Sequence, residues 1–252
     1  MGTAAIGFIY PDHAAEDDYQ RAAELLSTAD LDVVAHVRHI YGTDLHAVPE
    51  LLELGSPGKL RDGAAQLAAV EPDSVVWACT SGSFVYGTDG ARTQVETLAA
   101  DAGAPASSTS FAFVNAAQAM GVRRVAVAAS YPADIAALFE RFLAAHGIDV
   151  IAIGCAGIDT AAEVGTLRAG EVTELVVGND DAGADAVFVP DTAMHTIDVL
   201  PELEAAVGKP VLTANQVTVW EGLRISGHLT HSVQARSGLG RLFDGGAAGG
   251  RA

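Results

Sequence analysis

Cysteine, lysine and long apolar segments are scarce in this chain of 252 residues. The two cysteines, Cys79 and Cys155, favour free thiols over a disulfide framework, which fits a reducing cytoplasmic compartment. No segment reaches the roughly 18 apolar residues that a membrane-spanning helix needs. The N-terminal segment Met1–Ile6 lacks the basic region of a signal peptide. We therefore expect a soluble cytoplasmic protein that has no membrane partner.

Positive charge is also in short supply. The chain has 14 Lys and Arg residues against 32 Asp and Glu residues, and its formal net charge is -18. Lys59 and Lys209 are its only lysines. A surface of this sign repels the phosphates of nucleic acids and anionic lipids. We therefore expect no nucleic-acid partner.

Signatures of metals and cofactors are missing as well. None of the eight histidines forms a His-x-x-x-His pair or a comparable spacing with carboxylates. The glycines at Gly238 and Gly240 do not form a dinucleotide-binding loop between a strand and a helix, and no Gly-Lys-Ser/Thr phosphate-binding motif occurs. The sequence thus predicts chemistry by side chains alone, with no metal and no cofactor.

What the chain does contain is a regular alternation of short apolar runs with amphipathic segments. This alternation predicts an α/β fold with parallel sheets and right-handed crossovers. In such sheets ligands bind beyond the carboxyl ends of the strands. The expected strands are 6–10, 33–37, 75–78, 125–129, 150–153, 187–189 and 211–213, and the expected helices are 14–29, 60–69, 93–102, 111–120, 133–146, 168–178 and 196–207.

An internal repeat is the most informative feature. The apolar run Asp73–Ala78 leads to Cys79, and the run Asp185–Pro190 leads to Asp191, each followed by Thr. Self-similarity on this scale predicts two lobes related by a pseudo-two-fold axis, with Cys79 and Asp191 facing each other across a cleft. The alternative is that two α/β units share strand-turn patterns by chance.

A second correspondence sets the lobe boundaries. The segments Ala5–Pro11 and Val125–Pro132 are both strands that end in Tyr-Pro. We expect two pseudo-symmetric lobes, each a parallel sheet flanked by helices, with the active site in the cleft between them. Residues 1–104 would form the first lobe, completed by 214–244, and residues 105–213 the second. The glycine-rich tail, 245–252, is predicted to be disordered.

Cys79 is the first candidate for chemistry. It opens the segment Cys79-Thr80-Ser81-Gly82-Ser83, whose backbone N–H groups could hold an anion. The N-terminus of a following helix would lower the pKa of the thiol and produce a usable thiolate. The ordinary alternative is a buried, inert cysteine. Cys155 has no matching partner and is interpreted as structural.

Asp191 is the second candidate, as a proton donor or acceptor opposite Cys79. The alternative is a helix N-cap or a turn residue. Tyr131 could donate a hydrogen bond to a substrate oxygen, or could be only a packing residue. Pro11, Asp12 and Thr192 lie at the same strand ends. The predicted substrate-binding residues are therefore Pro11, Asp12, Thr80, Ser81, Tyr131 and Thr192.

A set of short motifs runs along nearly the whole chain: Gly7–Pro11, Ala78–Ser83, Gly121–Ala126 with Tyr131, Glu163–Gly165, Gly208–Val211, and Thr218 with Trp220. Together and in this order they resemble the aspartate/glutamate racemase superfamily, and within it the branch of maleate cis-trans isomerase, arylmalonate decarboxylase and the ectoine-utilisation proteins. The resemblance implies the two-lobed fold with a cofactor-free site between the lobes. In the racemases and isomerases two cysteines face each other there, and Cys79 matches the first while Asp191 stands in place of the second.

Three departures from the family pattern bear on the reaction. Decarboxylases of the branch keep only the second-lobe cysteine, the opposite of this chain. Maleate isomerases carry two asparagines that hold substrate carboxylate, at the places of Ala14 and Ala161. The string Asp12–Tyr19 is closer to the ectoine-utilisation proteins, so maleate is not the expected substrate.

The resemblance implies a cofactor-independent enzyme that acts on a small carboxylate. Our leading hypothesis is an isomerase in which a Cys79 thiolate adds to an activated alkene and Asp191 acts as the opposing acid/base. One alternative is a decarboxylase or lyase that passes through an enediolate, and another is a non-catalytic protein that kept the cleft to bind a metabolite. A homo-oligomer is compatible with each of these three hypotheses.

Overall fold

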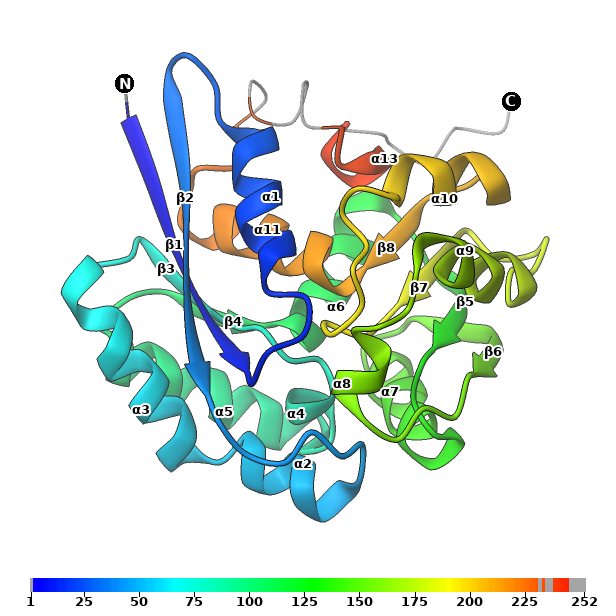
Figure 1. Cartoon of the computed structure of the whole chain (residues 1–252), viewed down its shortest axis with the longest axis horizontal. Coiled ribbons are helices and arrows are strands. Elements are labelled where there is room, and N and C mark those ends of the chain that lie inside the picture. Colours follow the sequence, from blue (N-terminus) through cyan, green and yellow to red (C-terminus); the bar gives the residue numbers. More distant parts are fainter. Residues whose placement is uncertain (1, 231–232, 234–237, 245–252) are drawn as a thin grey trace.

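Two four-stranded parallel sheets lie side by side in the computed structural model, which describes residues 2–230, 233 and 238–244 (Figure 1). The first sheet has the order β2-β1-β3-β4 and the second β6-β5-β7-β8, so the second repeats the strand order of the first. This repetition confirms the predicted fold class of two similar α/β lobes. The strands are β1 (Gly2–Pro11), β2 (Leu31–Ile40), β3 (Ser74–Trp77), β4 (Ala106–Ser108), β5 (Arg124–Ala129), β6 (Asp149–Cys155), β7 (Ala186–Val189) and β8 (Val211–Thr213).

The central strands owe their position to their apolar sequence. All four residues of β3 and all four of β7 are buried, as expected for strands covered by helices on both faces. The helices are α1 (Asp17–Leu26), α2 (Val48–Leu54), α3 (Pro57–Leu67), α4 (Ser81–Phe84), α5 (Gly87–Ala102), α6 (Thr109–Met120), α7 (Ala133–Ala145), α8 (Ala161–Val164), α9 (Ala169–Gly178), α10 (Leu200–Val207), α11 (Ala214–Ile225) and α13 (Gly240–Phe243), with a 3-10 turn at η1 (Ala68–Val70).

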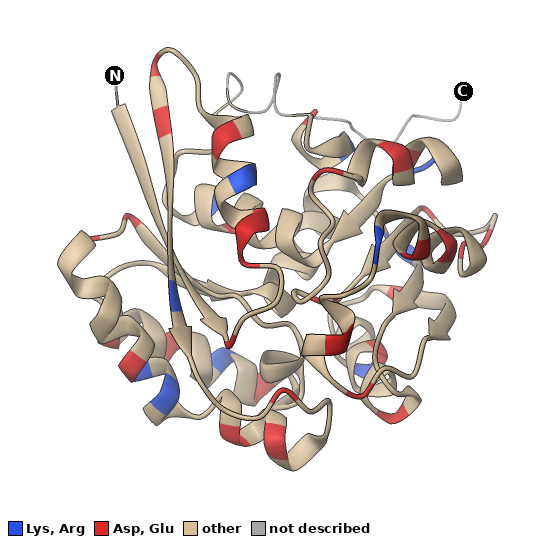
Figure 2. Cartoon of the chain, in the orientation of Figure 1, with Lys and Arg blue, Asp and Glu red and all other residues tan. Residues whose placement is uncertain are grey.

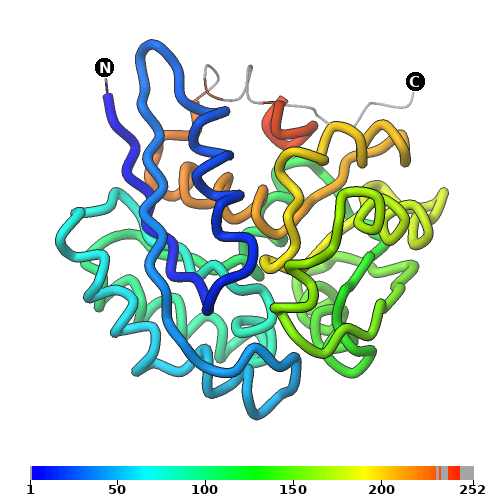
Figure 3. The backbone as a smooth tube through the Cα atoms, in the orientation of Figure 1, coloured from blue at the N-terminus to red at the C-terminus, as the bar shows by residue number. Residues whose placement is uncertain are grey.

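Helix α11 returns the chain from the second sheet to the first, as the orange part of the tube shows (Figure 3). It packs against β1, β3, β4 and α6. Sequence patterning did not predict this helix, because residues 214–223 are all buried and it therefore has no polar stripe.

Strand β4 pairs with β3, so the first sheet extends past the boundary that we expected at residue 104.

A short antiparallel contact joins the two lobes. Leu45, in the loop between β2 and α2, forms a β-bridge with Thr160, just before α8. The N–H of His46 donates to the carbonyl of Asp159 at 2.7 Å, and the N–H of Ala161 donates to the carbonyl of Asp44 at 2.9 Å. This contact closes one side of the space between the sheets.

Acidic residues are spread over both lobes, and basic residues are sparse (Figure 2). In the described part of the chain, no helix combines the length and the apolar character needed to cross a bilayer. Cys79 and Cys155 are both free thiols. The tail that we predicted to be disordered, 245–252, lies outside the described residues.

Candidate active site

The carboxyl ends of β1, β3 and β7 meet at one cavity between the lobes. Of the eight predicted site residues, six line it: Pro11, Asp12, Cys79, Ser81, Asp191 and Thr192. The loop after β2 and the start of α8 complete its wall. The other lining residues are Tyr10, His13, Ala14, Gly42, Thr43, Asp44, Leu45, His46, Leu51, Leu54, Ala161, Ala162 and Ala193.

Cys79 lies between the buried strand β3 and the short helix α4, and its side chain is almost completely buried. The N–H of Gly82 donates to the sulfur at 3.3 Å, and Ser81 Oγ lies 3.8 Å from it. A Cβ at position 82 would come within 2.9 Å of the Trp77 ring and 3.1 Å of the sulfur. Glycine is therefore needed for the backbone to approach the thiol so closely.

The Cys79 thiol is protonated at neutral pH. Burial raises its pKa from 9.0 to about 11, and the negative charge of Asp191 acts in the same direction. We expected the opposite, a pKa lowered by a helix N-terminus. That expectation is wrong because α4 has only four residues and its N–H groups offset only part of the desolvation.

Asp191 follows β7 and is 3% exposed. Its Oδ2 accepts a hydrogen bond from the Ser130 hydroxyl, and its Oδ1 accepts one from the N–H of Ala193 at 2.9 Å. The hydrogen bond from the N–H of Ala193, two residues later in the chain, is typical of an Asp side chain in a turn, which is one of the two roles that we considered. Asp191 nevertheless also lines the cavity, so both interpretations of this residue describe part of its environment.

His46 is a site residue that sequence reasoning missed. Its Nε2 lies 3.8 Å from Asp191 Oδ2, and its Nδ1 is 3.0 Å from the carbonyl oxygen of Ile158. Its side chain is 5% exposed and its ring packs edge-to-face on Tyr131. The one signal in the sequence was its place in the loop that follows the carboxyl end of β2, where ligands bind in such sheets.

Thr80 and Tyr131 are buried and do not line the cavity. The Tyr131 hydroxyl donates to the carbonyl of Pro190, and its ring packs on Phe84 as well as on His46. The carbonyl of Thr80 accepts a hydrogen bond from Ser110 at 2.8 Å. These contacts fit the packing alternative for Tyr131.

Tyr10, rather than Tyr131 as we expected, lines the cavity. Its hydroxyl donates to the carbonyl of Thr192 at 2.9 Å and accepts from the N–H of Ala15 at 3.0 Å, which ties the two lobes together. Burial raises the pKa of Tyr10 well above its ordinary value, so this hydroxyl keeps its proton.

Asp12, two residues on, has φ +50, the left-handed conformation that turns the chain away from β1.

The charge of the lining limits how a ligand can be held. Three carboxyl side chains, Asp12, Asp44 and Asp191, face the cavity, and none of the described lining residues is Lys or Arg. The lining residues that can become cationic are His13 and His46. A carboxylate in this cavity would therefore depend on backbone N–H groups, hydroxyls and histidine rather than on a permanent positive charge.

The sequence model of the arylmalonate decarboxylase family matches residues 57–243. The chain belongs to this family. Arylmalonate decarboxylase of Bordetella bronchiseptica is 31% identical over 147 residues, which cover 56% of this chain and 59% of that relative's length. Maleate isomerase of Pseudomonas putida is 26% identical over 167 residues, which cover 64% of this chain and 67% of that protein. The resemblance to this branch is thereby confirmed.

Solved structures of maleate isomerases and of arylmalonate decarboxylase have the same fold. The maleate isomerase from Pseudomonas putida S16 with maleate has a TM-score of 0.84 at 20% identity, covering 98% of this chain and 99% of that one. A liganded mutant of arylmalonate decarboxylase has a TM-score of 0.81 at 26% identity, covering 98% and 100%. A mutant of Nocardia farcinica maleate cis-trans isomerase with a covalently bound succinylcysteine intermediate has a TM-score of 0.86 at 20% identity, covering 96% and 99%.

Proposed function

We propose that this protein is a cofactor-independent enzyme that acts on a small carboxylate and transfers a proton at the carbon next to that carboxylate. The observation that carries the proposal is the buried pair of Cys79 and Asp191, brought by the two lobes to the wall of one cavity. A thiol and a carboxyl group that line the same cavity form an arrangement suited to general acid–base chemistry. Family membership supports the reaction class.

Decarboxylation is the reaction that the state of Cys79 favours. Cleavage of the bond to a carboxylate releases CO₂ and leaves its electron pair in an enediolate. The α-carbon of that enediolate then takes the proton of the neutral Cys79 thiol, which becomes a thiolate. A thiol with a pKa of about 11 is protonated in the free enzyme and ready for this step.

The Cys79 thiolate must then be protonated again before the next turnover. Asp191 and His46 lie beside each other at 3.8 Å and would return a proton from solvent to the thiolate. The N–H of Gly82, 3.3 Å from the sulfur, stabilises the thiolate while it lasts. Because the donor stands on the first lobe only, we expect a prochiral malonate to give a product of one configuration.

Isomerisation is the second candidate, and it is supported by the likeness to a maleate cis-trans isomerase that holds a succinylcysteine intermediate. Here the Cys79 sulfur would bond to one alkene carbon, the former double bond would rotate, and the C–S bond would break again. This route needs a thiolate at the outset. Binding of substrate would have to transfer the thiol proton to Asp191 or His46.

Product mass separates the two reactions. The purified protein is incubated with substituted malonates, and separately with unsaturated mono- and dicarboxylates, in deuterated water. Decarboxylation lowers the substrate mass by CO₂ and places one deuterium on the α-carbon, whereas isomerisation conserves the substrate mass.

The control for these assays is Cys155→Ser, which removes the exposed thiol and should leave turnover unchanged. Turnover that survives in Cys79→Ser would contradict the proposed role of the thiol. Saturable binding of carboxylates without turnover or deuterium incorporation would support the metabolite-binding alternative instead.

A further inference from the structure

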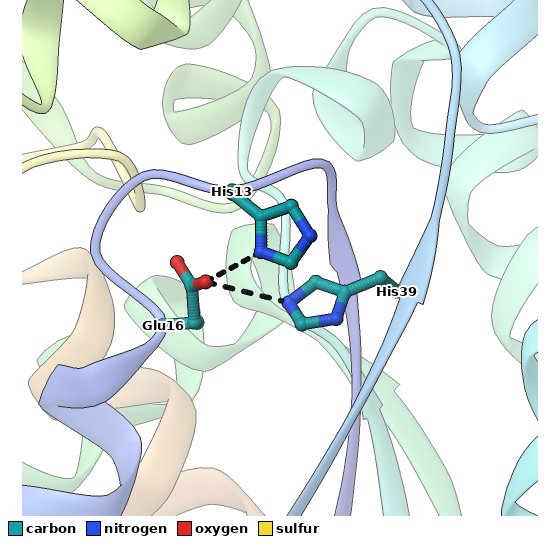
Figure 4. Close-up of side chains that lie close together, drawn as sticks. All are labelled: His13, Glu16 and His39. Carbon is teal, nitrogen blue, oxygen red and sulfur yellow. Dashed lines mark hydrogen bonds and ion pairs between the residues drawn. The ribbon is translucent and has the colours of Figure 1, made fainter.

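A cluster of three possible metal ligands lies next to the active-site cavity. His13 and Glu16 belong to the loop between β1 and α1, and His39 is on β2 (Figure 4). One ligand atom from each residue lies within 4.8 Å of the other two. The sequence held no such motif, because His39 is 26 positions from His13 and is brought close only by the pairing of β1 with β2.

The geometry is close to that of a bound ion. His13 Nδ1 lies 2.6 Å from Glu16 Oε1, and His39 Nε2 lies 3.7 Å from the same oxygen. Around a tetrahedral Zn²⁺ with bonds of about 2.0–2.1 Å, neighbouring ligand atoms are separated by about 3.3 Å. To admit such an ion, the contact of His13 with Glu16 would have to lengthen by about 0.7 Å and that of His39 with Glu16 to shorten by about 0.4 Å.

Two further observations point to a ligand. His39 Nε2 is buried and has no hydrogen-bond partner among the described residues, which is a costly state for a buried polar atom. The outer atoms of the other two ligands are already held, since Glu16 Oε2 accepts from the N–H of Ala14 at 2.9 Å and His13 Nε2 lies 3.3 Å from the Tyr41 hydroxyl. Such outer contacts orient the ligands of protein metal sites.

We propose that His13, Glu16 and His39 bind a divalent transition-metal ion of the zinc class beside the active-site cavity. Two imidazole nitrogens and one carboxylate oxygen are typical ligands of such ions, and they leave a fourth position open. His13 also lines the cavity, whose described lining includes three carboxyl groups and no Lys or Arg. An ion there would supply positive charge that could attract an anionic ligand.

The test is titration of the untagged full chain with Zn²⁺ by calorimetry and with Co²⁺ by absorption spectroscopy. We expect one equivalent of metal per chain. His39→Ala, and Glu16→Gln, which keeps the shape of the side chain, should each weaken binding by at least about 10-fold. Circular dichroism verifies that both variants are folded.

The matched control is His195→Ala, which removes a histidine that faces a carboxylate, Asp17, at 2.9 Å but belongs to no group of three possible ligands in the described part of the chain. It should bind metal like the wild type. Absence of saturable binding in the wild type, or unchanged affinity in both His39→Ala and Glu16→Gln, would overturn the proposal. Because the measurement is of metal binding rather than turnover, neither result bears on the roles of Cys79 and Asp191.

Discussion

The raised pKa of the Cys79 thiol gives a prediction that can be worked through in numbers. A pKa of about 11 against 9.0 for an ordinary thiol means that, at any pH below about 9, the thiolate fraction is about 100-fold smaller. Only the thiolate reacts with iodoacetamide. At pH 7.5 the smaller thiolate fraction should slow the alkylation of Cys79 by up to about 100-fold relative to a small-molecule thiol, and restricted access would slow it further.

The assay uses the Cys155→Ser variant, in which Cys79 is the only cysteine. Alkylation is followed by mass spectrometry from pH 7 to 10. The rate should rise about tenfold for each pH unit across this whole range, because the titration midpoint lies above it. This slope does not depend on how freely the reagent enters the cavity, so it separates the effect of ionisation from that of burial on access.

A second substitution tests the cause of the raised pKa. Asp191→Asn removes a negative charge that raises it, so the alkylation rate at a given pH should increase. The pKa should remain above 9.0, since burial is the larger cause. A rate that levels off near pH 8 in the Cys155→Ser protein would refute the reasoning and restore the resting thiolate that we first expected.

Four further substitutions test the site. Cys79→Ser should reduce turnover by at least ~10³ with little change in Tm, and Asp191→Asn by ~10²–10⁴, as kinetics and thermal melts on the same samples would show. His46→Gln should lower kcat, because it removes the ring whose Nε2 lies 3.8 Å from Asp191 Oδ2; an unchanged kcat would leave His46 a packing residue. Gly82→Ala should destabilise the fold by about 1–3 kcal/mol in urea denaturation, since its Cβ would contact the Trp77 ring at 2.9 Å.

Much of the fold could be predicted from local sequence patterns. Apolar runs such as those of β3 and β7 predict buried parallel strands, because a strand covered on both faces needs apolar residues at every position. The repeat that ends in Cys79 and Asp191 predicted the matching lobes. The repeat also placed Cys79 and Asp191 at strand ends, and both residues line the same cavity.

The limits of that prediction have physical causes. Helix α11 is buried on all sides, so its sequence has no amphipathic period to detect. Strand β4 has three residues and joins the first sheet only through its pairing with β3. Neither property can be read from the residues of the segment alone.

The sequence by itself determined which reactive groups stand at the strand ends, and the tertiary structure decided what state they are in. The protonation of Cys79 depends on desolvation by elements far away in the chain and on the charge of Asp191, 112 positions further on. The contact of His46 with Asp191 and the meeting of His13 with His39 likewise join residues from different elements. Periodicity is a local property of a chain, whereas pKa values and ligand geometry depend on everything packed around a group.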